Sequence, residues 1–230
     1  REAIALAVDQ DAIVEKLLRG NAEVANTIMT PESIASAYDA DEARKVLGEV
    51  PQRGFDLEKA AQLIAESSEP DGFTTEITYP NAGAELGTAA QSMAENLKTL
   101  GITLKVREIS MEEWLATIGD GEHGLGFMWY FSTTGDPGEV NGYLLGNQDN
   151  PNNVDSPEAQ SLIDAAAAAA DPTERVGILM QLEQLNYENV YNSPLWWGQS
   201  ITYFSNKVGV DEFTPFALLG PWGAALYAAA

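Results

Sequence analysis

The chain has 230 residues, of which 45% are hydrophobic, enough for a packed core. Thirty-five acidic against 12 basic residues give a net charge of −23, which repels nucleic acid and anionic lipid head groups, so no nucleic-acid partner is expected. With no Cys and one His, thiolate zinc sites, Cys nucleophiles, disulfide frameworks and His-rich metal sites are excluded, and no cofactor is expected. No apolar run approaches the roughly 20 residues of a membrane span.

The first twenty residues place their apolar side chains at helical spacing, and Gly20 is the expected end of this helix. Arg1 already lies within the pattern, and no capping residue precedes it. We therefore expect the chain to be a fragment of a longer protein.

Two further segments predict short helices. YDADEARKVLGE (38–49) and FDLEKAAQLIAE (55–66) each carry an aromatic residue, an Asp suited to cap a helix, and aliphatic residues before Glu.

Residues 74 to 107 predict a strand, a helix and a second strand. TTEITYP (74–80) and ITLKVR (102–107) alternate apolar and polar residues, and the segment between them carries one apolar helical face that ends at Gly101. The pattern is typical of a βαβ unit with parallel strands, and so of an α/β fold.

A third strand is predicted over GLGFMWYF (124–131), after a short helix that Ser110 and Glu113 open as a capping box. Because this strand is apolar on both faces, we expect it in the centre of the sheet. Ligands in open α/β sheets bind beyond the carboxyl ends of the strands, which places STTGDP (132–137) at the expected site.

The remaining chain is mostly helical. Ser156-Pro157 and Asp171-Pro172 each combine a cap with a proline in the first helical position. LWWGQSITYF (195–204) then predicts a strand whose two adjacent tryptophans point to opposite faces.

Aromatic residues cluster near the ends of the predicted strands, and the sequence contains no catalytic motif. No G-x-S-x-G, H-E-x-x-H, Walker or dinucleotide fingerprint occurs. Such aromatics suit either a small-molecule site or a plain core. Three hypotheses stay open: a binding module, a carbohydrate-active enzyme using a carboxylate pair under the aromatics, and a protein interaction domain. The aromatic residues are Trp129, Tyr130, Phe131, Trp196, Trp197 and Tyr203.

Five segments carry a resemblance to a known family, and one of them keeps the motif D-P-x-E-R at 171–175. In this order they resemble segments of the family 5 extracellular solute-binding proteins, which serve ABC importers of peptides, nickel chelates and some oligosaccharides. The segments are 1–20, 55–66, 101–118, WYFSTTGDP at 129–137, and 156–197.

The resemblance implies an α/β fold with a mixed sheet and flanking helices, one lobe of a type II periplasmic-binding-protein fold. Residues 1–230 would form a single C-terminal ligand-binding lobe, with the tail 206–230 contacting a missing N-terminal lobe. It also implies a protein that is no enzyme, lies in the periplasm or on the cell surface with a lipid anchor, and delivers a peptide or other small polar solute to an ABC transporter permease.

The resemblance also implies the ligand-binding residues. In peptide-binding members, an acidic residue four positions before the Pro pairs with the amino terminus of the ligand, and here that position is Thr133. A hydroxyl group cannot neutralise an ammonium, so the alternatives are a blocked or modified peptide, a sugar or another polar solute. Asp136 either contacts the ligand or accepts a backbone hydrogen bond in a turn. The full set is Trp129, Tyr130, Phe131, Ser132, Thr133, Asp136 and Trp197.

Overall fold

The computed structural model of the chain contains two compact units, Arg1–Trp197 and Gly198–Ala230. None of the helices in the described ranges is long and apolar enough to cross a bilayer. The structure describes residues 1–118, 124–130, 132–146, 150–199, 202–211, 213 and 220–229.

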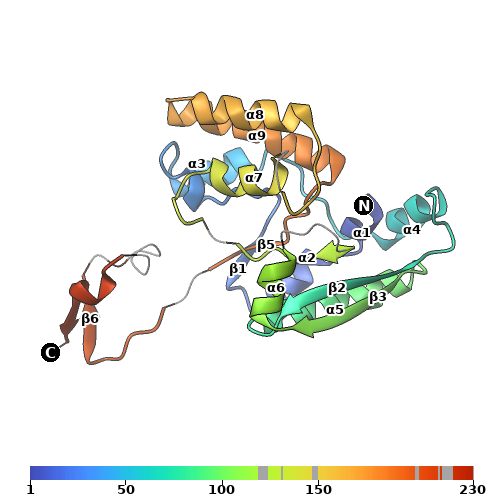
Figure 1. Cartoon of the computed structure of the whole chain (residues 1–230), viewed down its shortest axis with the longest axis horizontal. Helices are drawn as coiled ribbons and strands as arrows, with labels where there is room; N and C mark the ends of the chain where they lie inside the picture. The colour runs from blue at the N-terminus through green and yellow to red at the C-terminus, as the bar shows by residue number, and fades with distance from the viewer. Residues whose placement is uncertain are drawn as a thin grey trace. The chain divides into compact units, whose positions relative to one another are not determined.

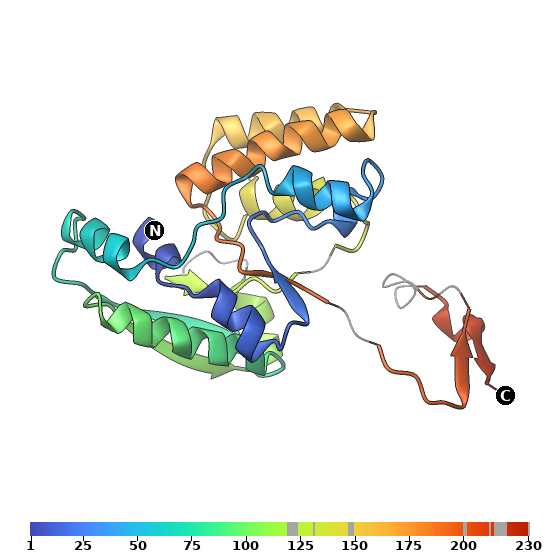
Figure 2. The ribbon, with the colours of Figure 1, turned by 180° about the vertical axis from the view of Figure 1, so that it is seen from behind.

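The first unit contains a three-stranded parallel sheet in the order β3-β2-β4. β2 (Thr74–Pro80) and β3 (Thr103–Ile109) pair over all seven residues of each strand. Helix α5 (Ala84–Lys98) connects them and lies along one face of the sheet, as Figure 1 and Figure 2 show from opposite sides. The predicted βαβ unit is confirmed, and so is the predicted α/β fold with flanking helices.

The predicted third strand is wrong in both length and place. β4 consists only of Leu125–Gly126 and lies at the edge of the sheet, with β2 in the centre. Beyond it the chain leaves the sheet: Phe127 is buried in one hydrophobic core and Met128 packs against another. Phe127 and Met128 are apolar because they enter two different cores, whereas Trp129 and Tyr130 after them are exposed. Phe131 lies outside the described residues.

Five helices begin at the side-chain caps that the sequence predicts. In each, the cap oxygen accepts a backbone N–H of the first turn that has no partner within the helix. The helices are α3 (Ala40–Leu47), α4 (Leu57–Ala65), α6 (Met111–Thr117), α8 (Pro157–Ala168) and α9 (Pro172–Asn189), capped by Asp39, Asp56, Ser110, Ser156 and Asp171.

The N-terminal segment forms three short helical pieces, so the prediction of one continuous helix is wrong. They are α1 (Glu2–Leu6), α2 (Gln10–Ala12) and the π-helical turn η1 (Ile13–Leu17). The break occurs where Asp9 accepts a hydrogen bond from the N–H of Ala12 and caps a new helix. Both sides of the break face one core, which preserves the apolar spacing.

The first unit has two hydrophobic cores. One lies between the sheet, α5, α1 and α4; the other lies among α3, α7 (Gly138–Leu145), α8 and α9. In both views α8 and α9 lie side by side next to α7 and α3, away from the sheet (Figures 1 and 2). The largest fully buried apolar residues are Leu97 and Ile102 in the first core and Met29, Ile34, Leu47, Leu145, Leu179 and Leu182 in the second.

A two-stranded sheet links the cores. β1 (Ala22–Val24) pairs with β5 (Trp196–Gly198). Trp196 packs against the first core and Trp197 against the second, which confirms that the adjacent tryptophans face opposite ways. The strand is shorter than the predicted 195–204, and residues 200 and 201 lie outside the described residues.

The second unit is small. β6 (Val208–Val210) pairs antiparallel with β7 (Leu226–Ala228), which follows the 3-10 turn η4 (Trp222–Ala225). The ring of Tyr227 covers Gly209, where a Cβ would lie 2.3 Å from the ring. Tyr203 and Tyr227 are 87% and 51% exposed.

Candidate ligand-binding site

The predicted site loop lies between β4 and α7. Trp129 and Tyr130 are 49% and 39% exposed, unlike the buried Phe127 that precedes them. The ring of Tyr130 stacks on Tyr143 of α7, with 5.5 Å between centroids. This contact packs one face of the Tyr130 ring against α7.

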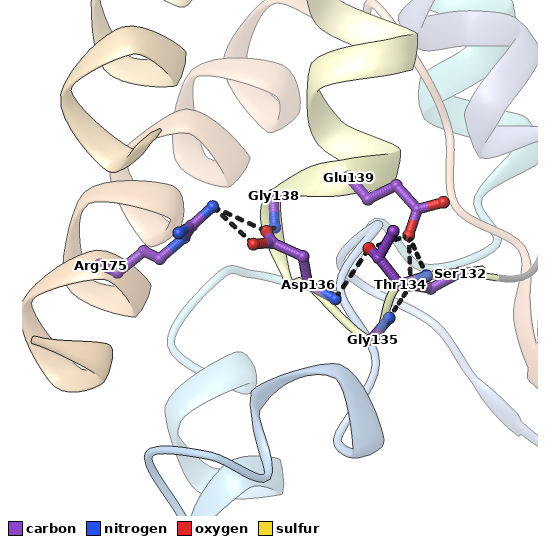
Figure 3. A network of polar contacts seen from close by, with 7 residues as sticks. All are labelled: Ser132, Thr134, Gly135, Asp136, Gly138, Glu139 and Arg175. Carbon is purple, nitrogen blue, oxygen red and sulfur yellow. Dashed lines mark hydrogen bonds and ion pairs between the residues drawn. The ribbon is translucent and has the colours of Figure 1, made fainter. Parts of the chain in front are cut away.

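One carboxylate organises the loop. Glu139, in the first turn of α7, accepts hydrogen bonds from the hydroxyl groups of Ser132 at 2.6 Å, Thr133 at 2.7 Å and Thr134 at 2.6 Å. The backbone N–H groups of Thr133 and Thr134 donate to the same carboxylate at 2.9 to 3.0 Å. The hydroxyl group of Tyr130 donates at 3.1 Å. Figure 3 shows part of this network from close by.

These hydrogen bonds set the charge of Glu139. Partial burial on its own raises the pKa of the carboxyl group, but the hydrogen bonds from Ser132, Thr133 and Thr134 outweigh burial and hold the pKa well below its usual range. The carboxylate is therefore ionised at neutral pH. Among the described residues, no Lys or Arg forms an ion pair with it.

A second carboxylate ties the loop to α9. Asp136 pairs with Nη2 of Arg175 at 2.8 Å through Oδ1 and at 2.7 Å through Oδ2. Oδ1 also accepts the N–H of Gly138 at 2.7 Å (Figure 3), as the turn interpretation of Asp136 predicts. A Cβ at position 138 would lie 3.2 Å from that oxygen, so glycine leaves room for the ion pair.

Trp197 lies in a different setting. Its Nε1 donates to the carbonyl oxygen of Thr27 at 3.0 Å, and its ring packs against the second core. The structure thus brings five of the predicted residues together in one loop: Trp129, Tyr130, Ser132, Thr133 and Asp136. Phe131 lies outside the described residues, and its place in the site stays a prediction, as does that of Trp197.

A buried glutamate holds the segment beside Thr27. Glu183 of α9 is 1% exposed and accepts the N–H of Ile28 at 3.0 Å and the N–H of Met29 at 2.8 Å. The side-chain amide of Asn141 donates to it at 2.9 Å. Burial raises the pKa of Glu183, and the three hydrogen bonds oppose that effect.

Glu139, Arg175 and Glu183 were not predicted from the sequence as parts of these networks. Glu139 had a local signal, because an acid in the first turn of a helix after a run of hydroxyl residues can accept their hydrogen bonds. Arg175 stands in the D-P-x-E-R motif, but nothing in the motif names its partner. Glu183 had no local signal, since its partners lie 42 or more positions away.

Both carboxylates of the loop, those of Glu139 and Asp136, accept hydrogen bonds from neighbouring groups of the chain itself. A general acid would need a raised pKa, whereas the pKa of Glu139 is lowered. In the described ranges, no group of three or more His, Cys, Asp or Glu side chains could hold a metal ion. The arrangement suits binding by aromatic faces and hydroxyl groups.

The model of the bacterial extracellular solute-binding proteins, family 5 (middle part), matches residues 1–152. Two curated relatives are 26% identical: the probable di/tripeptide-binding protein 5 of Pseudomonas aeruginosa, over 94% of this chain and 40% of that protein, and heme-binding protein A of Haemophilus influenzae, over 85% and 35%. The periplasmic binding protein DppA of Helicobacter pylori, solved in complex with the peptide STSA, superimposes with a TM-score of 0.83 at 19% identity, over 100% of this chain and 44% of that one.

The fold is that of a solute-binding protein, since the whole chain superimposes on part of one. The chain belongs to the bacterial extracellular solute-binding proteins, family 5, whose model matches well over half of its length. It spans about two fifths of the length of the curated relatives.

Proposed function

We propose that this chain is the C-terminal lobe of the substrate-binding component of an ABC importer, and that a peptide or another small polar solute binds on residues 129–136. The observation that carries the proposal is the loop itself. Two exposed aromatic rings precede three hydroxyl residues that one carboxylate fixes in place, in a chain of a solute-binding family. Rigid aromatic faces with nearby polar groups are the usual lining of small-molecule sites.

A second lobe completes the site in this proposal. The chain spans only about 40% of its first relative, which leaves room for an N-terminal lobe. The two lobes would close about a hinge, and the ligand would favour the closed state by contacts that exist only there. We propose that the tail 206–230 contacts that lobe; its exposed Trp222 and Tyr227 support this.

Export to the periplasm or cell surface, lipid anchoring and delivery of the solute to a permease are also parts of the proposal. They rest on the family, which is described as extracellular. No catalytic step is included, because the loop carboxylates are occupied as described above. The relatives' names include a di/tripeptide-binding and a heme-binding protein, so the family alone does not fix the ligand.

Calorimetry would test the proposal. The ligand that co-purifies with the two-lobed protein, identified by native mass spectrometry, should bind the 230-residue chain far more weakly than the two-lobed protein, because the contacts of the second lobe are missing. Equal affinity would refute the two-lobe arrangement.

In the two-lobed protein, Trp129→Ala and Tyr130→Ala should each weaken binding roughly tenfold or more. Phe55→Ala, which removes an aromatic ring 43% exposed outside the loop, is the matched control.

A further inference from the structure

We propose that Glu139 determines which chemical group of a ligand the loop accepts. Its carboxylate turns residues 132–134 into a surface of hydrogen-bond acceptors. This surface selects a ligand group that donates hydrogen bonds, and it favours a cation over an anion. The inference rests on the proposed function, because the ligand must sit on this loop.

The first step concerns the protons of the loop. A hydroxyl group has one proton to donate. At Ser132, Thr133 and Thr134 this proton is directed to the Glu139 carboxylate, at 2.6 to 2.7 Å. The backbone N–H groups of Thr133 and Thr134 are committed to the same carboxylate. A ligand carboxylate, which only accepts hydrogen bonds, would therefore meet only oxygen lone pairs at these hydroxyl groups.

The second step identifies the free acceptor. The hydroxyl oxygen of Ser132 already accepts the N–H of Gly135 at 2.9 Å, and that of Thr134 accepts the N–H of Asp136 at 3.2 Å. The hydroxyl oxygen of Thr133 accepts from no described group, and this residue is exposed. A hydroxyl oxygen has two lone pairs, so Ser132 and Thr134 each keep one, whereas the exposed Thr133 keeps both and offers a donor of the ligand the most open acceptor of the three.

The third step concerns charge. The ionised carboxylate of Glu139 lies one hydrogen bond behind the Thr133 hydroxyl, at 2.7 Å, and no described cation neutralises it. A hydroxyl group that donates to a carboxylate becomes a stronger acceptor at its remaining lone pairs. A primary ammonium at Thr133 gains this bond and the attraction of the charge behind it. The neutral Thr133 thus faces the ligand, with the negative charge of Glu139 directly behind its hydroxyl group.

The test uses three probes that differ only at the amino end: dialanine with its free ammonium, N-acetyl-dialanine with a neutral N–H, and N-succinyl-dialanine with an added carboxylate. Calorimetry on the two-lobed protein should give the tightest binding for dialanine and the weakest for the succinyl form. In Glu139→Gln the ratio between these two affinities should fall roughly tenfold, equivalent to about 1.4 kcal/mol.

Two further variants separate charge from loop structure. Glu188→Gln removes an exposed carboxylate of α9 with the same change in net charge, and should leave the ratio unchanged. The double variant T133D/E139Q returns a carboxylate to the loop surface and should restore the preference for dialanine, which a collapsed loop would not do.

The outcomes distinguish this inference from the proposed function. An unchanged ratio in Glu139→Gln, with Trp129→Ala and Tyr130→Ala still weakening all probes, would overturn the role of Glu139 and leave the loop as the site. Binding that none of these three variants affects would overturn the loop as the site. Preference of the unmodified protein for the succinyl probe would overturn the inference directly, and binding of none of the probes would count against both.

Discussion

Replacing Glu183 with methionine is expected to lower the free energy of unfolding by about 2 to 4 kcal/mol. The side chain is 1% exposed, and three donors meet its oxygens at 2.8 to 3.0 Å: the N–H groups of Ile28 and Met29 and the amide of Asn141. Methionine has a similar length and no strong acceptor, so each donor loses its partner at about 1 to 3 kcal/mol. Relief from burying a carboxyl group offsets part of this loss.

Urea unfolding of the 230-residue chain at pH 7 would measure the effect. Glu188→Met, an exposed position on the same helix whose carboxylate accepts from Gln184, is the control and should change stability by less than about 0.5 kcal/mol. If Glu183→Met were as stable as the unmodified chain within that margin, the three hydrogen bonds would stabilise the chain no more than burying the Glu183 carboxyl group destabilises it, which would refute the prediction. Adding Asn141→Leu removes one orphaned donor and an acceptor that has no partner, so the double variant should recover about 1 kcal/mol.

Three further perturbations test the loop and the first core. Because the pKa of Glu139 is lowered in the folded chain, its hydrogen bonds stabilise the chain at neutral pH, and this stabilisation is lost as the pH falls below about 4.5. The difference in the free energy of unfolding between the unmodified chain and Glu139→Gln should therefore narrow in acid. A difference that widens would contradict the described hydrogen bonds. Asp136→Asn removes a partly exposed ion pair and should cost about 1 kcal/mol, less in high salt, whereas a loss independent of salt would indicate packing instead. Gly87→Ala places a Cβ 2.4 Å from the ring of Tyr79 and should lower the melting temperature, while Gly177→Ala meets open space and should raise it; the reverse order would refute the packing.

Elements with local signals were predictable from the sequence. The caps of five helices depend on the cap residue and the N–H groups two or three positions later, so a short window contains the whole interaction. The βαβ unit follows from alternation in its two strands and a helical face between them. Such signals do not depend on the rest of the fold.

The failed predictions concern segments whose apolar spacing fits more than one backbone path. An apolar run from 124 to 131 fits a strand flanked on both sides, yet here Phe127 and Met128 enter different cores. The N-terminal segment keeps a helical spacing across the break at Asp9, because both halves face one core. Periodicity reports which residues are buried, not how many cores bury them.

The loop proposed as the site was predictable from the sequence, but the hydrogen-bond network that holds it was not. The aromatic residues and the turn at Asp136 follow from composition near a strand end. The partners that fix the loop come from other elements: Arg175 lies 39 positions from Asp136, and Glu139 belongs to the next helix. The Arg175–Asp136 pair depends on the packing of α7 and α9, which no short window contains, whereas the bonds to Glu139 span only five to seven positions and had a local signal.

The adjacent tryptophans of β5 have a consequence for how the chain unfolds. Trp196 belongs to one core and Trp197 to the other, with a single peptide bond between them. Phe127 and Met128 make the same change of core at the start of the proposed binding loop. Unfolding of one core would therefore displace residues of the other at two places in the chain, and we expect both cores to unfold in one cooperative transition. The loop on which we propose that the solute binds begins directly after Phe127 and Met128, so its position depends on the folding of both cores.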